Sequence, residues 1–159
     1  MKTMLNKIQV LLFNEFRSDN RVLKECVSLK NAGYEVEMFA TQAAGLPEYD
    51  ESNGFLVRRI KTGPLNFLLS NLFFYWLKGS WLLRREKVFH CNDLYTLPIA
   101  VAIKIIFDRD VRIIYDAHEL ETESNIVGVM PWLKLPVVLA ERFLIVRGKL
   151  HKRGLPNGR

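Results

Sequence analysis

The chain has 159 residues, 49% of them hydrophobic, which is enough for one domain of ordinary size with a buried core and leaves little room for two. The formal net charge is +6, but all 17 acidic residues and 18 of the 23 Lys and Arg residues precede Arg147, so the charge of that part is only +1. The charge therefore does not indicate a nucleic-acid-binding face, and we expect no nucleic acid among the partners.

Strands and helices alternate along the sequence. Ile8 to Phe13 predicts a buried strand, and the helix that follows is capped by Ser18 or Asp19 and ends near Gly33. Another helix is predicted at Leu97 to Phe107. Four more strands are predicted, at Tyr34 to Phe39, Gly54 to Ile60, Lys87 to His90 and Val111 to Tyr115. This alternation predicts an α/β fold, a single three-layer Rossmann-like domain around a parallel sheet.

Two further segments predict an exposed edge of the sheet and the absence of common nucleotide-binding motifs. Thr41 to Asn53 is polar and is expected to be a connection, and Arg58 and Arg59 in the strand after it suggest an exposed edge. The loop after the first strand contains neither GxGxxG nor GxxxxGK[ST]. We therefore expect no dinucleotide site, no P-loop ATP site and no resident cofactor.

The cysteines and the amino terminus favour a reducing compartment. Cys26 and Cys91 are far apart in sequence and match no metal-ligand spacing, so neither a disulfide framework nor a structural zinc site is expected. Met1 to Lys7 runs into the first strand without an apolar signal-peptide region. We expect the protein in the cytoplasm or at the inner face of the membrane.

The segment from Leu65 to Leu83 is the most apolar part of the chain. It approaches the length of a membrane span, but Asn66, Ser70, Asn71 and Lys78 interrupt it, and a central Lys costs about 3 kcal/mol in hydrocarbon. Aromatic residues with cations directly after them favour a helix lying in the interface of an anionic membrane. The alternative is a helix of the domain that is buried against the sheet.

An apolar strand ends abruptly in three ionisable residues, Asp116, His118 and Glu119. Ligands of open α/β sheets bind beyond the carboxyl ends of the strands, so these side chains are candidates for a site. His118 can exchange a proton near neutral pH, with carboxylates close by to orient it. The alternative is a turn in which Asp116 caps the next segment.

Two other predicted strands also end in polar side chains: Arg17, Asp19 and Arg21 after the first, and His90, Asn92 and Asp93 after the fourth. A shared rim would offer groups for sugar hydroxyls and for phosphate. It would lack a nucleophile with an adjacent base, because the side chains of His90 and Cys91 should point apart on a strand. A metal site at His90, Asp93 and His118 is not expected, since the spacing matches no familiar ligand pattern.

These segments together resemble the amino-terminal domain of family 4 glycosyltransferases of the GT-B fold. The similarity covers about residues 7–146 and is carried by Asp19 to Glu25 followed by Ser28-Leu29 and Ala32 to Val36, then by Val88 to Asp93, Tyr115 to Glu119, and Glu141 with Arg142. It implies a Rossmann-like domain that holds the acceptor, a second domain that holds a nucleotide sugar, and retention of anomeric configuration. It also implies a glycan or lipid-linked acceptor, as in the assembly of cell envelope polysaccharides.

The resemblance also implies roles for residues. His118 would touch the transferring sugar or the acceptor hydroxyl, Asp116 and Glu119 would shape the loop, and Asp93 with Asn92 would bind the acceptor. The family often has His-x-His-Asp where this chain has His-Cys-Asn-Asp, which makes Asn92 the weaker candidate. Substrate-binding roles for Asp19 and Arg21 compete with a simple helix cap and a surface ion pair between the two.

The expected organisation is a domain over residues 1–146 and a basic, disordered tail over residues 147–159. The function expected from the resemblance is the acceptor-binding half of a retaining glycosyltransferase that lacks its own domain for the nucleotide-sugar donor. The alternative is a non-catalytic, membrane-associated binding module that keeps the fold.

Overall fold

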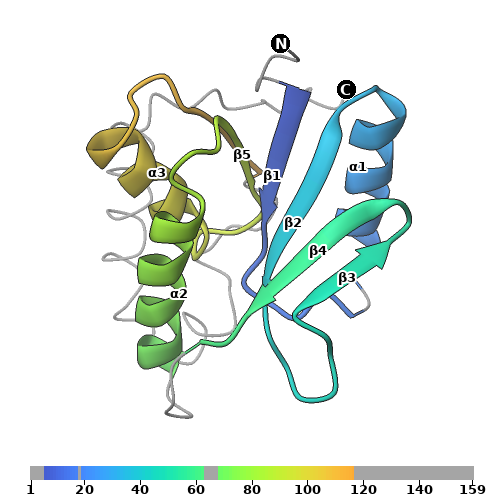
Figure 1. Ribbon diagram of the computed structural model, residues 1–159, viewed down its shortest axis with the longest axis horizontal. Helices are drawn as coiled ribbons and strands as arrows, with labels where there is room; N and C mark the ends of the chain where they lie inside the picture. The colour runs from blue at the N-terminus through green and yellow to red at the C-terminus, as the bar shows by residue number, and fades with distance from the viewer. Residues whose placement is uncertain (1–5, 18, 63–67, 117–159) are drawn as a thin grey trace, which may run out of the picture.

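A computed structural model describes residues 6–17, 19–62 and 68–116 (Figure 1). His118, Glu119, Glu141, Arg142 and the basic segment 147–159 lie outside the described residues, so the expectations for them stay predictions. The elements in chain order are β1 (Lys7–Leu11), α1 (Asn20–Asn31), β2 (Glu35–Thr41), β3 (Tyr49–Ser52), β4 (Phe55–Ile60), α2 (Leu68–Leu82), β5 (Val88–Cys91), α3 (Leu97–Ile106) and β6 (Arg112–Tyr115).

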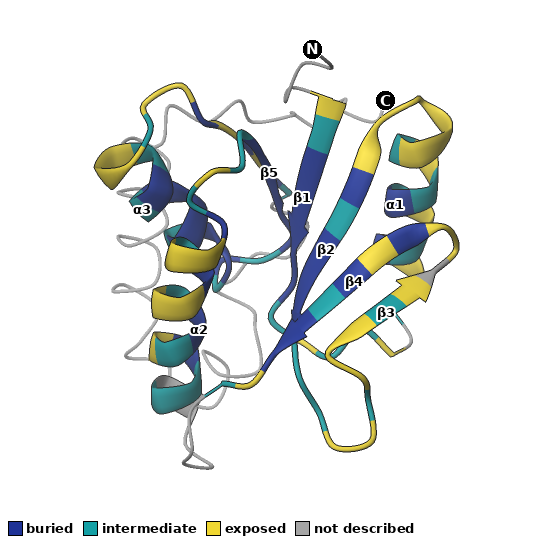
Figure 2. Ribbon diagram, viewed as in Figure 1, coloured by how far each residue is buried: buried dark blue, intermediate teal, exposed yellow. Residues whose placement is uncertain are grey.

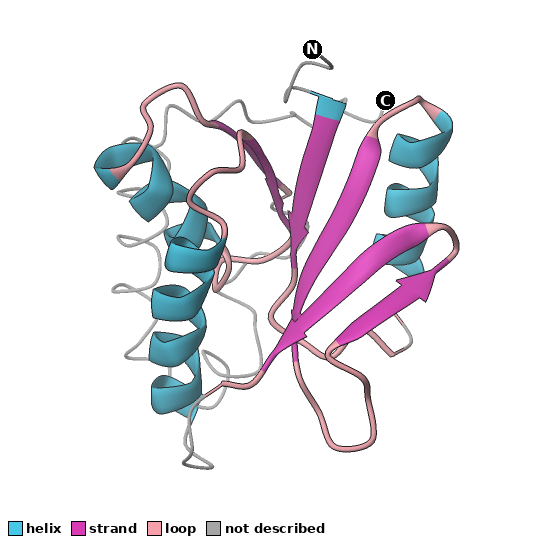
Figure 3. Cartoon of the chain, viewed as in Figure 1, coloured by secondary structure: helices cyan, strands magenta, loops and turns pink. Residues whose placement is uncertain are grey.

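The strands form one sheet of six strands in the order β3-β4-β2-β1-β5-β6. All neighbouring strands are parallel except β3 and β4, which pair antiparallel. Helix α1 covers one face of the sheet, and α2 and α3 lie on the opposite side (Figure 3). The predicted α/β class with three Rossmann-like layers is therefore confirmed, with one antiparallel strand added at an edge.

Alternating side chains of the strands build a core on each face of the sheet. Ile8, Val10 and Val36 belong to the core under α1, and Leu11, Phe39 and Phe89 to the core under α2 and α3. Figure 2 shows the buried residues concentrated in the middle strands and on the inner sides of the helices. The two buried faces fix the register of the parallel strands, because a slip by one residue would exchange their inward and outward side chains.

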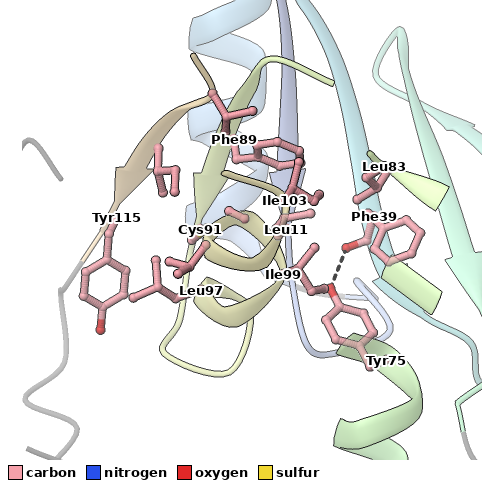
Figure 4. Packing of buried hydrophobic residues seen from close by; sticks show 14 of the residues in the cluster. Leu11, Phe39, Tyr75, Leu83, Phe89, Cys91, Leu97, Ile99, Ile103 and Tyr115 are labelled. Carbon is pink, nitrogen blue, oxygen red and sulfur yellow. Dashed lines mark hydrogen bonds between the residues drawn. The ribbon is translucent and has the colours of Figure 1, made fainter. Parts of the chain in front are cut away.

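Tyr75 anchors α2 to the sheet. Its side chain is completely buried, and its hydroxyl lies 3.1 Å from the Leu12 carbonyl oxygen and 3.2 Å from that of Phe39 (Figure 4). One turn further along α2, a Cβ atom on Gly79 would come within 2.6 Å of Ile99 Cδ1. The absence of a side chain at Gly79 therefore allows α2 and α3 to approach closely.

The edge of the sheet differs from the prediction. The segment predicted as a polar connection contains β3, and this strand covers β4, so Arg58 and Arg59 do not lie on an edge strand. Arg59 is only 2% exposed. Its guanidinium donates hydrogen bonds to the carbonyl oxygens of Glu15 and Pro47 and to Asp50 Oδ2, which satisfies the charge inside the protein.

Helix α2 combines features of both alternatives for the apolar segment. Leu72, Tyr75 and Leu83 are buried against the domain, whereas Phe73 and Trp81 remain more than half exposed. No helix among the described residues is long and apolar enough to cross a membrane.

Removal of the Tyr75 hydroxyl tests its anchoring role. We expect Tyr75→Phe to lower the free energy of unfolding by about 1–2 kcal/mol, because the carbonyl oxygens of Leu12, just after β1, and of Phe39 in β2 lose a buried donor. Urea denaturation of the full chain, followed by circular dichroism, measures this change. Tyr34→Phe is the matched control, since Tyr34 is 41% exposed, and it should leave the midpoint unchanged. Equal stability of the two variants would contradict the assignment.

Candidate functional site

The five parallel strands end at the same edge of the sheet, and the loops beyond these ends carry the predicted site residues. Asp19 and Arg21 follow β1, Asn92 and Asp93 follow β5, and Asp116 follows β6. Parallel strands present their carboxyl ends together, and ligands of open α/β folds bind there. The described members of the predicted site thus lie along one rim.

Arg21 and Asp116 meet although they are 95 residues apart in sequence. Arg21 Nη1 donates to Asp116 Oδ2 at 3.2 Å, and both side chains are partly exposed, at 44% and 39%. The Asp116 backbone N–H donates to the Cys91 carbonyl oxygen at 3.0 Å, which holds the residue beside the end of β5. The alternative interpretation of Arg21 as part of a surface ion pair is thus correct in kind, but the partner is Asp116 and not Asp19.

Asp19 caps α1, as one of the two sequence interpretations predicted. Its Oδ1 accepts a hydrogen bond from the Val22 backbone N–H at 3.1 Å. Asp19 also lines a cavity described below, so the same residue caps the helix and borders a candidate ligand site. A carboxylate has enough lone pairs for both.

Asp93 holds two loops of the rim together. Its Oδ1 accepts from the Thr96 backbone N–H at 2.8 Å and its Oδ2 from the Phe13 N–H at 3.3 Å. Asn92 is completely buried, and its side-chain amide lies 3.4 Å from the Leu11 carbonyl oxygen. Through these contacts Asn92 and Asp93 stabilise the loops after β1 and β5. Their contact with an acceptor stays a prediction.

A cavity of about 400 Å³ lies beside the rim, between α1, the loop after β1 and the β3–β4 hairpin. Its lining combines one aromatic ring, two aliphatic side chains, two carboxylates, two amides and two guanidinium groups: Phe16, Leu23, Leu46, Asp19, Asp50, Asn20, Asn53, Arg17 and Arg59. A neighbouring hollow of about 410 Å³ shares Arg17 and Asp19 with it. The cavity therefore continues around the β1–α1 loop.

The walls of this cavity are fixed by contacts within the domain. Phe16 has a left-handed backbone with φ of 51°, which is unusual for a bulky residue, and its ring packs against Phe55 at 6.2 Å between centroids. The Asn14 side chain accepts from the Phe16 N–H at 2.8 Å, and Arg17 donates to the Ala44 carbonyl oxygen at 3.1 Å. Backbone strain of this kind is concentrated at functional sites.

The sequence interpretation missed Phe16, Asp50 and Arg59 as cavity residues. Asp50 lies in the segment predicted as a loop, and Arg59 was expected on an exposed edge. Asp50 and Arg59 come together because β3 pairs with β4. The polar sequence Asp50-Glu51-Ser52 lacks the alternation of apolar residues that predicts a strand, so this pairing was not foreseen.

His90 and Cys91 point to opposite faces of the sheet, as predicted. His90 Nε2 lies 3.3 Å from Glu25 Oε1 of α1, whereas Cys91 belongs to the core under α3. Burial, reinforced by the Asp93 charge, raises the pKa of the Cys91 thiol far above its usual range, and burial raises the pKa of Cys26 to about 12. Neither thiol is therefore an activated nucleophile.

No protein-family model matches the chain, and no curated protein matches it. Solved structures do match its fold. Sucrose-phosphate synthase from Thermosynechococcus elongatus superposes with a TM-score of 0.67 at 14% identity, over 87% of this chain and 40% of that chain. A second structure of this enzyme gives a TM-score of 0.58 at 17% identity, over 84% of this chain and 70% of that one.

The catalytic domain of starch synthase IV from Arabidopsis thaliana, bound to ADP and acarbose, matches with a TM-score of 0.51 at 12% identity. This match covers 69% of the present chain and 33% of the starch synthase chain. The chain thus spans 40% of the first sucrose-phosphate synthase chain and 33% of the chain of the starch synthase catalytic domain. At these identities the likeness concerns the fold, which is the Rossmann-like α/β fold of GT-B glycosyltransferases.

Proposed function

We propose that this domain binds the acceptor of a retaining glycosyltransferase and forms one wall of a cleft whose other wall is a nucleotide-sugar-binding domain. The observation that carries the proposal is the cavity of about 400 Å³ next to the rim of a GT-B-like sheet. The acceptor class is a glycan or a lipid-linked sugar. The donor domain would belong either to a longer form of the protein or to a partner chain.

The cavity has the chemistry of a sugar site. The carboxylates of Asp19 and Asp50 can accept hydrogen bonds from sugar hydroxyl groups, and the amide of Asn20 can both accept and donate them. The Phe16 ring offers an apolar surface for a sugar face. Its volume lies near the lower end of ligand pockets, which span about 300–1,000 Å³. This size suits one sugar unit better than a long oligosaccharide.

The rim offers the groups that a transfer reaction requires beside such a sugar. Arg21 and Arg17 are partly exposed cations near the cavity and suit a phosphate of an acceptor or donor. In this proposal His118, which follows Asp116 by two residues, contacts the transferring sugar or the acceptor hydroxyl. Imidazole titrates near neutral pH and so suits that position, with Glu119 shaping the loop.

Sugar binding by the full chain tests the cavity. We expect a panel of monosaccharides, disaccharides and sugar phosphates to contain ligands detectable by saturation-transfer NMR, with Asn20→Ala weakening their binding at least tenfold, about 1.4 kcal/mol. Asn31→Ala, at the other end of α1, is the matched control and should bind as the wild type does. A panel without any ligand, or equal binding by both variants, would count against the site.

The role of His118 is tested in the assembled enzyme. We expect the full chain, combined with the nucleotide-sugar domain captured as its partner, to transfer sugar, and His118→Ala to reduce kcat at least a hundredfold without changing the Tm. Retained activity would remove His118 from the site. Capture of no such partner, together with sugar binding by the cavity, would favour the non-catalytic binding module.

A further inference from the structure

Helix α2 presents an exposed apolar stripe on the side away from the sheet. Phe73, Leu77 and Trp81 follow one another at intervals of four residues, which places them in one line along the helix, and they are 58%, 58% and 60% exposed. The opposite side of the helix is held in the core by Tyr75, and Leu83, directly after the helix, is buried in the same core. Figure 2 shows this contrast between the inner and outer sides of α2. The stripe is therefore a fixed surface on a firmly packed helix.

Cations surround the stripe. Arg84 stacks on the Trp81 ring at 4.2 Å, Lys78 lies 6.0 Å from the centre of the Phe74 ring, and Arg85 is exposed next to them. The sequence has no acidic residue between Glu51 and Glu86, and the neighbouring helix α3 has none either. No carboxylate of α2 or α3 thus offsets the positive charge of this face.

We propose that this face of α2 binds the surface of an anionic phospholipid membrane. The aromatic rings would lie at headgroup depth and the Lys and Arg side chains on lipid phosphates, which is how cationic amphipathic helices bind an interface. The helix has 15 residues, about 22 Å, and so is shorter than a hydrocarbon core of about 30 Å. It would lie parallel to the membrane plane.

The charge of the face favours lipid over a second copy of the chain. A symmetric dimer through the stripe would bring Lys78, Arg84 and Arg85 of two copies together without counter-charges. An anionic membrane supplies these counter-charges. The inference goes beyond the proposed sugar site, because the residues of the cavity include α1 residues and α1 lies on the opposite side of the sheet from α2 (Figure 1).

Vesicle co-sedimentation of the full chain tests the proposal. We expect binding to vesicles of equal parts phosphatidylglycerol and phosphatidylcholine, and at least tenfold weaker binding to pure phosphatidylcholine. The triple variant Phe73→Ser, Leu77→Ser, Trp81→Ser removes only exposed side chains and should weaken binding to the anionic vesicles at least tenfold. Leu56→Ser, at an exposed apolar position in β4, is the control and should bind as the wild type does.

A charge-reversal pair separates this face from the overall positive charge. Arg84→Glu with Arg85→Glu should weaken binding to the anionic vesicles, whereas Lys24→Glu with Lys30→Glu on α1 makes the same change of net charge and should have little effect. Equal loss in both pairs would overturn the proposal, since attraction would then be unspecific. Tight binding by the triple serine variant would also overturn it, as would dimerisation through the stripe without binding to vesicles.

Discussion

The burial of strand β1 is the constraint on which the other layers depend. Val10 and Leu11 are completely buried on opposite faces of the strand, and β2 and β5 occupy its two hydrogen-bonding edges. Such a strand requires an apolar cover on each side, which α1 supplies on one face and α2 with α3 on the other. The chain leaves β1 at the carboxyl edge, where its next residues build the wall of the cavity.

Acidic residues of the rim hold the loops in place, and some of them also line the cavity. Asp93 accepts hydrogen bonds from the main chain of Phe13, after β1, and of Thr96, at the start of α3, and Asp19 both caps α1 and lines the cavity. Asp50 serves as the counter-ion of the buried Arg59 while lining the same cavity. Carboxylates whose loops are already held by such contacts need little further ordering when a ligand binds.

Most of the fold could be predicted from local sequence patterns. Apolar runs marked five of the six strands, and Asp19 and Gly33 marked the two ends of α1 correctly, because capping and left-handed turns depend on neighbouring residues only. Strand β3 escaped prediction, since an antiparallel edge strand needs few buried side chains. The burial of Arg59 depends on that strand and was missed for the same reason.

The candidate site was predictable as a set of loops and not as a set of contacts. The strands of a parallel sheet all end at the same edge, so the loops that carry the predicted polar residues meet there. The partner of Arg21 and the cavity with Phe16 depend on contacts between segments that are distant in sequence. No local spacing encodes such contacts.

The exposure of the Arg21–Asp116 ion pair has a thermodynamic consequence. Ion pairs that remain in contact with water contribute about 0–1 kcal/mol, so the domain loses little when this one opens. In the proposed function, a phosphate would therefore replace the carboxylate as the partner of Arg21 with little loss of stability. The main-chain hydrogen bond from Asp116 to Cys91 does not involve the carboxylate, so the backbone of Asp116 stays in place during that exchange.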